Sequence, residues 1–86
     1  MFALEIRPKA KKQIARLCQH DRKLEEKLRK ALGEIQDNPF KAGQALKGFT
    51  DYMRCKVDYR HRLVYRVIGN VIFVMEFATR ENVDYD

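Results

Sequence analysis

Apolar and polar residues alternate at the start of the chain and then change to a helical period. Phe2, Leu4 and Ile6 are separated by small or charged residues, which predicts a short strand buried on one face. Pro8 follows and suits the first position of a helix, where the amide donor that proline lacks is not needed. Beyond it, apolar residues recur at helical spacing at Ala10, Ile14, Leu17 and Cys18.

A second helical stripe follows after a short polar link. Asp21 stands where an N-cap is expected, and Asn38-Pro39 ends the pattern because the residue before a proline disfavours helical backbone. The link around residues 19–21 is short, which predicts that the two helices form an antiparallel hairpin. The apolar stripe of the second helix consists of Leu24, Leu28, Ala31, Leu32 and Ile35.

Period-two alternation returns after a connector at residues 38–50 and predicts three strands. Residues 52–57 and 62–67 alternate apolar with charged side chains. Gly69-Asn70 is a two-residue hairpin signal, and the nearly continuous apolar run at 71–78 is typical of a central strand. The order β-α-α-β-β-β predicts an α+β fold, in which a small, mainly antiparallel sheet has the helical hairpin packed on one face.

Size and composition narrow the class of protein. The 86 residues predict a single domain, residues 1–86, and 45% apolar residues are enough for a core. Cys18 and Cys55 have no metal-ligand spacing around them and are predicted to be buried thiols in a reducing cytoplasm. The longest apolar run, at 71–75, is too short to cross a membrane. We therefore expect a cytoplasmic protein without metal or cofactor.

The net charge of +6 is distributed unevenly along the chain. Lysines of the first helical segment add to a basic stretch in the second half, so an anionic partner is expected, either nucleic acid or an acidic protein. Between residues 47 and 66 the cations are Lys47, Arg54, Lys56, Arg60, Arg62 and Arg66, against only Asp51 and Asp58.

Four short motifs follow one another in a specific order: Asn38-Pro39, Leu46-Lys47-Gly48, Arg62-Leu63-Val64-Tyr65 and Thr79-Arg80-Glu81. Together with the order of elements, they resemble the RelE/ParE superfamily of toxins from type II toxin–antitoxin pairs. The resemblance covers nearly the whole chain and implies the RelE-like α+β fold. It also implies a cognate antitoxin protein as partner, in a toxin–antitoxin hetero-oligomer.

Two activities occur in this superfamily. RelE-type members are mRNA interferases that enter the ribosomal A site and cut the message, so their partners are mRNA and ribosomal RNA, whereas ParE-type members poison DNA gyrase. ParE-type chains usually have longer helices. Tyr85 follows Arg80 by one residue fewer than in the RelE pattern. The chain otherwise matches the basic and aromatic positions of RelE-type chains with Arg54, Lys56, Arg62, Arg80 and Tyr85.

Metal-free cleavage of RNA uses the neighbouring 2′-hydroxyl as nucleophile. It requires a base for the 2′ proton, an acid for the leaving 5′-oxygen, and cations for the charge on the phosphorane, which usually supply the largest share of catalysis. Arg62 is the first candidate for the last role because its planar guanidinium can hold two phosphate oxygens, and Arg80 is the second. Arg54 and Lys56 share one face of their strand and are expected to line the same groove.

The acid and the base are open among three residues. Lys56 suits the base if neighbouring cations favour its neutral form. Tyr85 suits either role, or stacking on a nucleobase. His61 has the side chain that titrates nearest neutrality, but in a regular strand it faces away from Arg62.

Further cations are candidates for RNA binding outside the reacting centre, and each has a simpler interpretation. Arg60 and Arg66 are alternatively exposed residues paired with Asp58 or Glu76 across the sheet. The lysines of the first helix are alternatively a solvated face. Tyr52, Tyr59 and Tyr65 are expected to be packing residues. The candidate RNA-binding set is Lys47, Arg60, His61, Arg66, Lys11 and Lys12.

The leading hypothesis from the sequence is a ribosome-dependent, metal-independent endoribonuclease that inhibits translation. A gyrase inhibitor without nuclease activity is the alternative. A third possibility is a catalytically inactive member that only binds its antitoxin or RNA. Serine-protease, cysteine-protease, metal and phosphate-loop patterns do not occur in the sequence.

Overall fold

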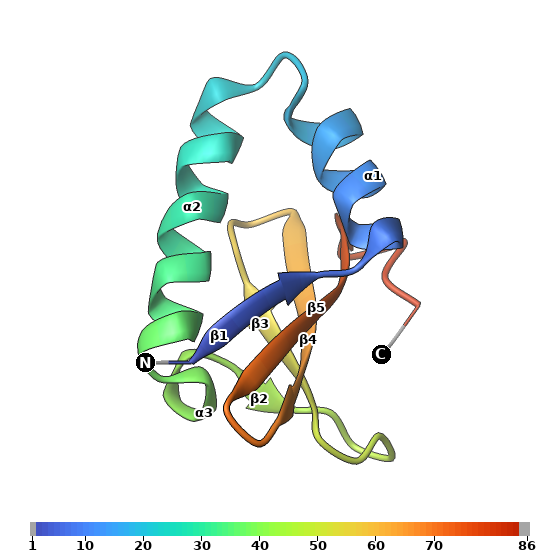
Figure 1. Cartoon of the computed structure of the whole chain (residues 1–86). Helices are drawn as coiled ribbons and strands as arrows, with labels where there is room; N and C mark the ends of the chain where they lie inside the picture. The colour runs from blue at the N-terminus through green and yellow to red at the C-terminus, as the bar shows by residue number, and fades with distance from the viewer. Residues whose placement is uncertain (1, 85–86) are drawn as a thin grey trace.

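A computed structural model describes residues 2–84 as one five-stranded sheet with helices against it (Figure 1). The strand order is β1-β5-β4-β3-β2, with β1 parallel to β5 and all other neighbours antiparallel. The predicted α+β fold is confirmed. The elements are β1 (Ala3–Ile6), α1 (Pro8–Cys18), α2 (Arg22–Asp37), α3 (Pro39–Ala42), β2 (Gln44–Ala45), β3 (Tyr52–Lys56), β4 (His61–Ile68) and β5 (Val71–Thr79).

The predicted helix signals are confirmed in the structure. Pro8 is the first residue of α1. Asp21 caps α2, and its Oδ1 accepts a hydrogen bond of 3.0 Å from the amide of Leu24. Gly69, with a φ of 60°, forms the tight turn between β4 and β5. No helix among residues 2–84 is both long and apolar enough to cross a membrane.

The connector at residues 38–50 contains two elements that the sequence pattern did not predict, α3 and β2. Asn38 ends α2 and also caps α3, because its Oδ1 accepts a hydrogen bond of 3.2 Å from the amide of Lys41. Pro39 takes the first position of α3, so the Asn-Pro pair is both a stop and a start signal. The two residues of β2 then pair with β3, Gln44 opposite Arg54.

The core lies between α2 and the inward face of β3, β4 and β5. Tyr65, Phe77 and Ile35 are its largest fully buried side chains. α1 packs beside β5, past the end of β1. There the side chain of Gln13 accepts a hydrogen bond of 2.9 Å from the amide of Phe77, which satisfies a strand-edge donor that β1 no longer reaches.

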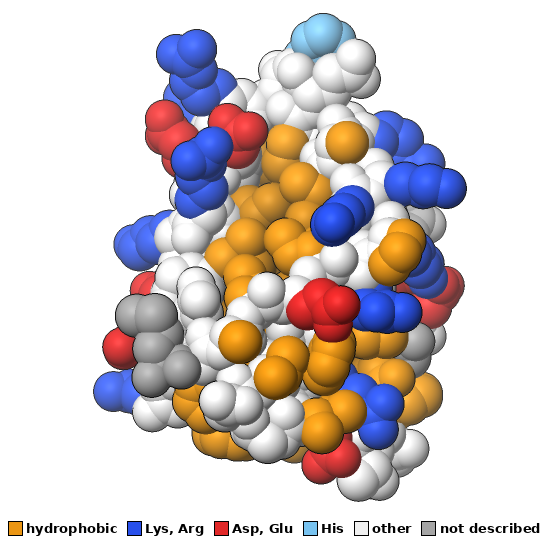
Figure 2. All heavy atoms as spheres, in the orientation of Figure 1, with side chains coloured by type: hydrophobic (Ala, Val, Ile, Leu, Met, Phe, Trp, Pro, Cys, Tyr) orange, Lys and Arg blue, Asp and Glu red, His pale blue; other side chains and the backbone are white. Residues whose placement is uncertain are grey.

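α1 and α2 diverge from the turn that joins them, which differs from a closely packed hairpin (Figure 1). Apolar side chains gather in a hollow between the two helices on the face that Figure 2 shows. Ile14 and Leu17 of α1 and Leu32 of α2 are accordingly only partly buried against the core.

The sheet contains one buried acid, Glu76, which is 1% exposed. Its Oε2 lies 3.1 Å from Nζ of Lys9 on α1, and its Oε1 accepts a hydrogen bond from the amide of Asp84. Lys9 also pairs with the Asp84 carboxylate. Glu76 therefore pairs with Lys9 rather than with the arginines suggested by the sequence, and the three residues hold the segment after β5 against the sheet.

The hydroxyl of Tyr65 tethers the connector to the sheet. Tyr65 is fully buried in β4, and its Oη donates a hydrogen bond to the carbonyl of Pro39. Burial raises the pKa of this phenol, so it remains a neutral donor. Gly43 passes directly over this contact: a Cβ added there would meet Oη of Tyr65 at 2.4 Å and the carbonyl oxygen of Arg54 at 2.9 Å.

We expect Gly43→Ala to destabilise the fold by about 1–3 kcal/mol, because the hydroxyl that the new methyl group meets is held by Pro39. Urea unfolding followed by circular dichroism measures this change. Gly33→Ala is the control: Gly33 is exposed in α2 with nothing within 4 Å of its added Cβ, so that change should stabilise the protein by up to about 1 kcal/mol. Equal stability of the two variants would contradict the close approach at Gly43.

Candidate functional site

The register between β3 and β4 places three of the predicted cations on one face of the sheet. Cys55 lies opposite Leu63, and both are buried in the core. Residues alternate between the two faces of a strand, so Arg54, Lys56 and Arg62 extend from the opposite face. Lys56 and Arg62 are themselves direct cross-strand partners.

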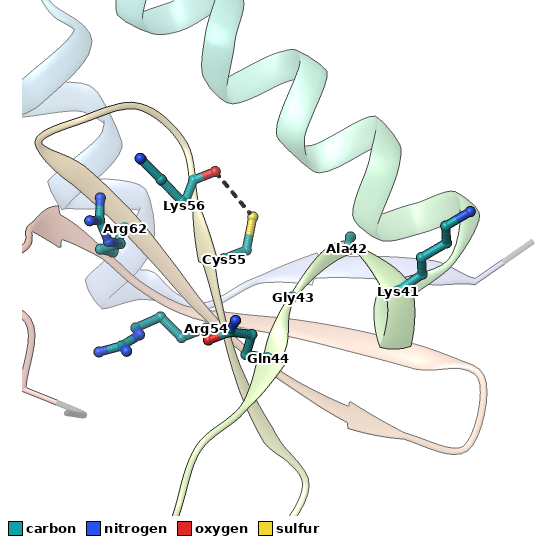
Figure 3. Close-up of a pocket in the computed structure, with 8 residues that line it drawn as sticks. All are labelled: Lys41, Ala42, Gly43, Gln44, Arg54, Cys55, Lys56 and Arg62. Atoms are coloured by element: carbon teal, nitrogen blue, oxygen red, sulfur yellow. Dashed lines mark hydrogen bonds between the residues drawn. The ribbon is translucent and has the colours of Figure 1, made fainter.

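These three cations line a pocket of about 420 Å³ between β3, β4 and the connector. Figure 3 shows the side chains of Arg54, Lys56 and Arg62 on the same side of β3, whereas the Lys41 side chain points away from them. Among the described residues no carboxylate lines the pocket, so its electrostatic field favours an anion. The remaining lining residues are Ala42, Gly43, Gln44 and Cys55.

The turn between β3 and β4 orients Arg62. Its Nη1 donates hydrogen bonds to the carbonyls of Asp58 at 2.9 Å, His61 at 3.1 Å and Tyr59 at 3.4 Å. These contacts hold the guanidinium in place before any ligand arrives and offset part of its repulsion by Lys56. The planar guanidinium group of Arg62 is therefore already oriented before a ligand binds.

His61 has a structural role in the same turn. Its Nδ1 lies 2.9 Å from Oδ1 of Asp58, and its ring stacks on Phe77 at a centroid distance of 5.6 Å. Because Phe77 belongs to the core, His61 faces the helices and not the pocket. Oδ1 of Asp58 also accepts hydrogen bonds from the amides of Arg60 and His61. Burial favours the neutral Asp58 carboxyl, but these hydrogen bonds outweigh it and lower its pKa.

Arg80 lies at the same end of the sheet as this turn. Its amide donates a hydrogen bond of 2.8 Å to the carbonyl of Arg60, and its Cζ lies 5.0 Å from the centre of the Tyr59 ring. A second contact joins its Nε to the Glu81 carboxylate at 3.6 Å. Tyr59 is 69% exposed, so the expectation that it is a packing residue is wrong. Tyr65, in contrast, is in the core as expected.

The other predicted residues lie apart from the pocket. Arg66 packs over the ring of Tyr52, with its Cζ 5.3 Å from the ring centre, at the opposite end of β3 from Lys56. Lys47 is exposed in the turn after β2. Tyr85 falls outside the described residues. Arg60 is exposed in the β3–β4 turn, whereas Lys11 and Lys12 are exposed on α1, beside β5.

Lys41 and Gln44 line the pocket but were not among the sequence candidates. They belong to α3 and β2, the two elements hidden in the connector, and the Asn38-Pro39 start signal could have pointed to them.

The pocket thiol is not a nucleophile. Burial raises the pKa of Cys55 to about 11, so the reactive thiolate is rare at neutral pH. Its Sγ donates a weak hydrogen bond to the carbonyl of Lys56. Within residues 2–84 no group of three or more His, Cys, Asp or Glu residues is arranged to hold a metal ion.

Comparison with known families gives one match across most of the chain. Residues 4–83 match the family model described as the ParE toxin of the type II toxin–antitoxin system parDE. The predicted relationship to the RelE/ParE superfamily is thus confirmed. No curated protein matches the chain in sequence at a significant level.

Solved structures of toxins are similar over nearly the full length. The intact E. coli RelBE toxin–antitoxin complex contains a chain 28% identical to this one, with a TM-score of 0.79, covering 95% of this chain and 100% of that chain. A double arginine-to-alanine mutant of the E. coli toxin RelE in the free state is 26% identical, with a TM-score of 0.78 and coverage of 98% and 88%. The YoeB dimer from Staphylococcus aureus is 24% identical, with a TM-score of 0.75 and coverage of 92% and 97%, and shares the fold.

We expect Asp58→Asn to destabilise the protein by about 1 kcal/mol at neutral pH, because the charged acceptor of three hydrogen bonds is lost. The folded-state pKa of Asp58 is lowered, so this stabilisation is fully present above the unfolded pKa of about 3.9 and is lost as pH falls through the folded value. Urea unfolding of both proteins from about pH 3 to 7 tests this. The difference should shrink as the pH falls below about 4.

Asp51→Asn serves as the matched control for this titration. Asp51 has a φ of 66°, a backbone conformation that asparagine accepts readily, so its replacement should change stability little at any pH. A difference between wild type and Asp58→Asn that persists unchanged at the acid end would contradict the role given to the carboxylate.

Proposed function

Since this chain belongs to the ParE toxin family of type II toxin–antitoxin systems, we propose that it is a toxin that cuts translated mRNA inside the ribosome, without a metal, and so stops translation. This is the activity of the RelE-type members of the superfamily. The family match by itself does not distinguish it from gyrase inhibition. The argument for cleavage comes from the pocket and from the sequence identity to E. coli RelE chains.

One observation carries the proposal: Arg54, Lys56 and Arg62 converge on one pocket with no described carboxylate in it. Simple affinity for a polyanion needs cations spread along a path. Three cations in one pocket are better suited to a single phosphate whose negative charge increases during reaction. Arg62 supports this best because its guanidinium plane is already oriented by the turn carbonyls.

In the proposed reaction the 2′-oxygen attacks the adjacent phosphorus and the bond from phosphorus to the 5′-oxygen breaks. The products are a 2′,3′-cyclic phosphate and a 5′-hydroxyl, so the atoms balance without water or metal. Arg62 and Arg54 stabilise the phosphorane oxygens, and Arg80, at the same end of the sheet, is the further cation proposed for this role. Lys56 is the proposed base for the 2′ proton, with Tyr85 as the alternative, and the group left protonated then returns that proton to the 5′-oxygen, so that no other proton donor is consumed.

The proposed partner that restrains this activity is a cognate antitoxin protein. The similar E. coli chain is in a toxin–antitoxin complex. An acidic segment of the antitoxin would neutralise the pocket cations and block access to the phosphate. The proposed place of action is the cytoplasm, with mRNA and ribosomal RNA as the other partners.

Gyrase inhibition is the second candidate function, because the family model that matches is that of the ParE toxin. It would require no nuclease activity, and the pocket cations would then serve only to bind a partner. Primer extension on translated message separates the two. Cuts at defined codon positions support the nuclease, whereas intact message together with double-strand breaks in DNA supports gyrase as the target.

We expect Arg62→Ala to lower the rate of message cleavage about 10²–10³-fold, because one preorganised cation is removed from the developing charge. Cleavage is measured by primer extension in a translating extract, with circular dichroism to confirm that the variant is folded. Arg62→Lys should cleave the message at a rate between those of the wild type and Arg62→Ala, since lysine keeps the charge but not the two parallel donors of the guanidinium. Arg29→Ala, which removes an exposed arginine from α2, is the control and should cut at the wild-type rate.

Retention of full cleavage by a folded Arg62→Ala protein would remove the pocket as the reacting centre. Absence of cleavage by the wild type on translating ribosomes would reject the nuclease itself.

A further inference from the structure

A second pocket, of about 390 Å³, adjoins the first and shares Lys56 with it. It lies between α2 and the β3–β4 turn. Its lining combines two exposed lysines of α2, an exposed aromatic ring and the stem of the turn. The residues are Lys27, Lys30, Ala31, Glu34, Lys56, Val57, Asp58 and Tyr59. None of the α2 lysines belongs to the candidate set from the sequence.

From this geometry we propose that the second pocket binds the nucleotide just beyond the two that flank the scissile phosphate, with the phosphate that joins it to them on Lys27 and Lys30 and its base on the ring of Tyr59. The proposal rests on the proposed nuclease function, since it takes the ligand to be an RNA strand. It extends the proposed site from a single phosphate to several consecutive nucleotides of an RNA strand.

The two lysines are suited to one phosphate group. Lys27 and Lys30 are three positions apart in α2, so their side chains leave the same face of the helix. Glu34 and Asp58 also line this pocket, but the Asp58 carboxylate is engaged by His61 and by backbone amides. With Lys56 at the junction, a strand that leaves the first pocket passes close to further cations in the second.

Tyr59 has the exposure and support of a stacking platform. Tyr59 is 69% exposed in a turn, so most of its surface is in contact with water. The guanidinium of Arg80 lies 5.0 Å from the ring centre and supports it by a cation–π contact. The carbonyl of Tyr59 accepts a hydrogen bond from Arg62, so the platform and the phosphate-binding guanidinium belong to one hydrogen-bonded unit. Exposed aromatic rings beside cations are the usual means of binding single-stranded RNA.

An acidic protein segment is the other ligand that lysines attract, and the ring of Tyr59 distinguishes the two. A peptide carboxylate needs only charge, whereas a nucleobase needs a flat ring face. An affinity that depends on both the ring and an intact base of the ligand, at unchanged charge, therefore indicates a nucleotide site.

The test uses 2′-O-methyl oligonucleotides, which the nuclease cannot cut, in fluorescence-anisotropy titrations at low salt. A dinucleotide spans the first pocket alone, and versions extended at the 5′ or the 3′ end reach the second. One of the two extensions should bind more tightly to the wild type. Tyr59→Leu should weaken that extended ligand roughly 5- to 100-fold and leave the dinucleotide unchanged, whereas Tyr59→Phe should bind like the wild type.

Charge is tested with Lys27→Gln/Lys30→Gln, which should lower the slope of log affinity against log salt for the extended ligand by about 0.7, because the two lysines together neutralise one phosphate charge. Arg22→Gln/Arg29→Gln removes the same charge from another face of α2 that lines neither pocket and should leave the slope unchanged. An extended ligand with an abasic end should lose the part of the advantage that comes from stacking, keep the part that comes from its phosphate, and become insensitive to Tyr59→Leu.

Extended ligands that bind no better than the dinucleotide, or equal sensitivity of intact and abasic ligands to Tyr59→Leu, would overturn the second pocket as a nucleotide site. Message cleavage would survive that result, so the proposed function would stand. If the wild type neither cuts translated message nor binds the dinucleotide, both the proposed nuclease function and the second pocket as a nucleotide site are rejected.

Discussion

In the pairing of β3 with β4, Cys55 lies opposite Leu63 and both side chains are buried in the core. A strand has only two faces, so the same pairing leaves Lys56 opposite Arg62 on the other face. A slip by one residue would bury the cations and expose the apolar set, at a cost that no surface contact could offset. The hydrophobic burial that stabilises the fold therefore also determines where the charges of the site point.

The cross-strand pair of Lys56 and Arg62 places two positive charges opposite each other, and their repulsion lowers the stability of the fold. Two like charges directly opposite each other in a sheet are destabilising, by about 0.2–1 kcal/mol. Three backbone carbonyls of the turn accept hydrogen bonds from Arg62 and offset part of this cost. An anion in the pocket would relieve the remainder. Arg62 is thus held in position without a ligand, which is the condition under which charge would stabilise the transition state of the proposed cleavage most effectively.

Much of the architecture could be predicted because its signals are local. The cap at Asp21, the proline at the start of α1 and the turn at Gly69 each depend on residues within one turn of chain. The connector could not be predicted in the same way. β2 has only two residues, too few to show alternation, and it is placed by Tyr65, which is distant in sequence and bonded to Pro39.

The aromatic residue at the second pocket illustrates the same limit. Alternation along β4 was enough to assign Tyr65 to the core. Tyr59 lies in a turn, where no period applies. Only the structure shows that Tyr59 is exposed and that Arg80, just after β5, lies over its ring. Local sequence therefore determined the elements outside the connector, their faces and the candidate cations of β3 and β4. The tertiary fold selected which cations share a pocket, because that depends on strand register and on contacts between segments far apart in the chain.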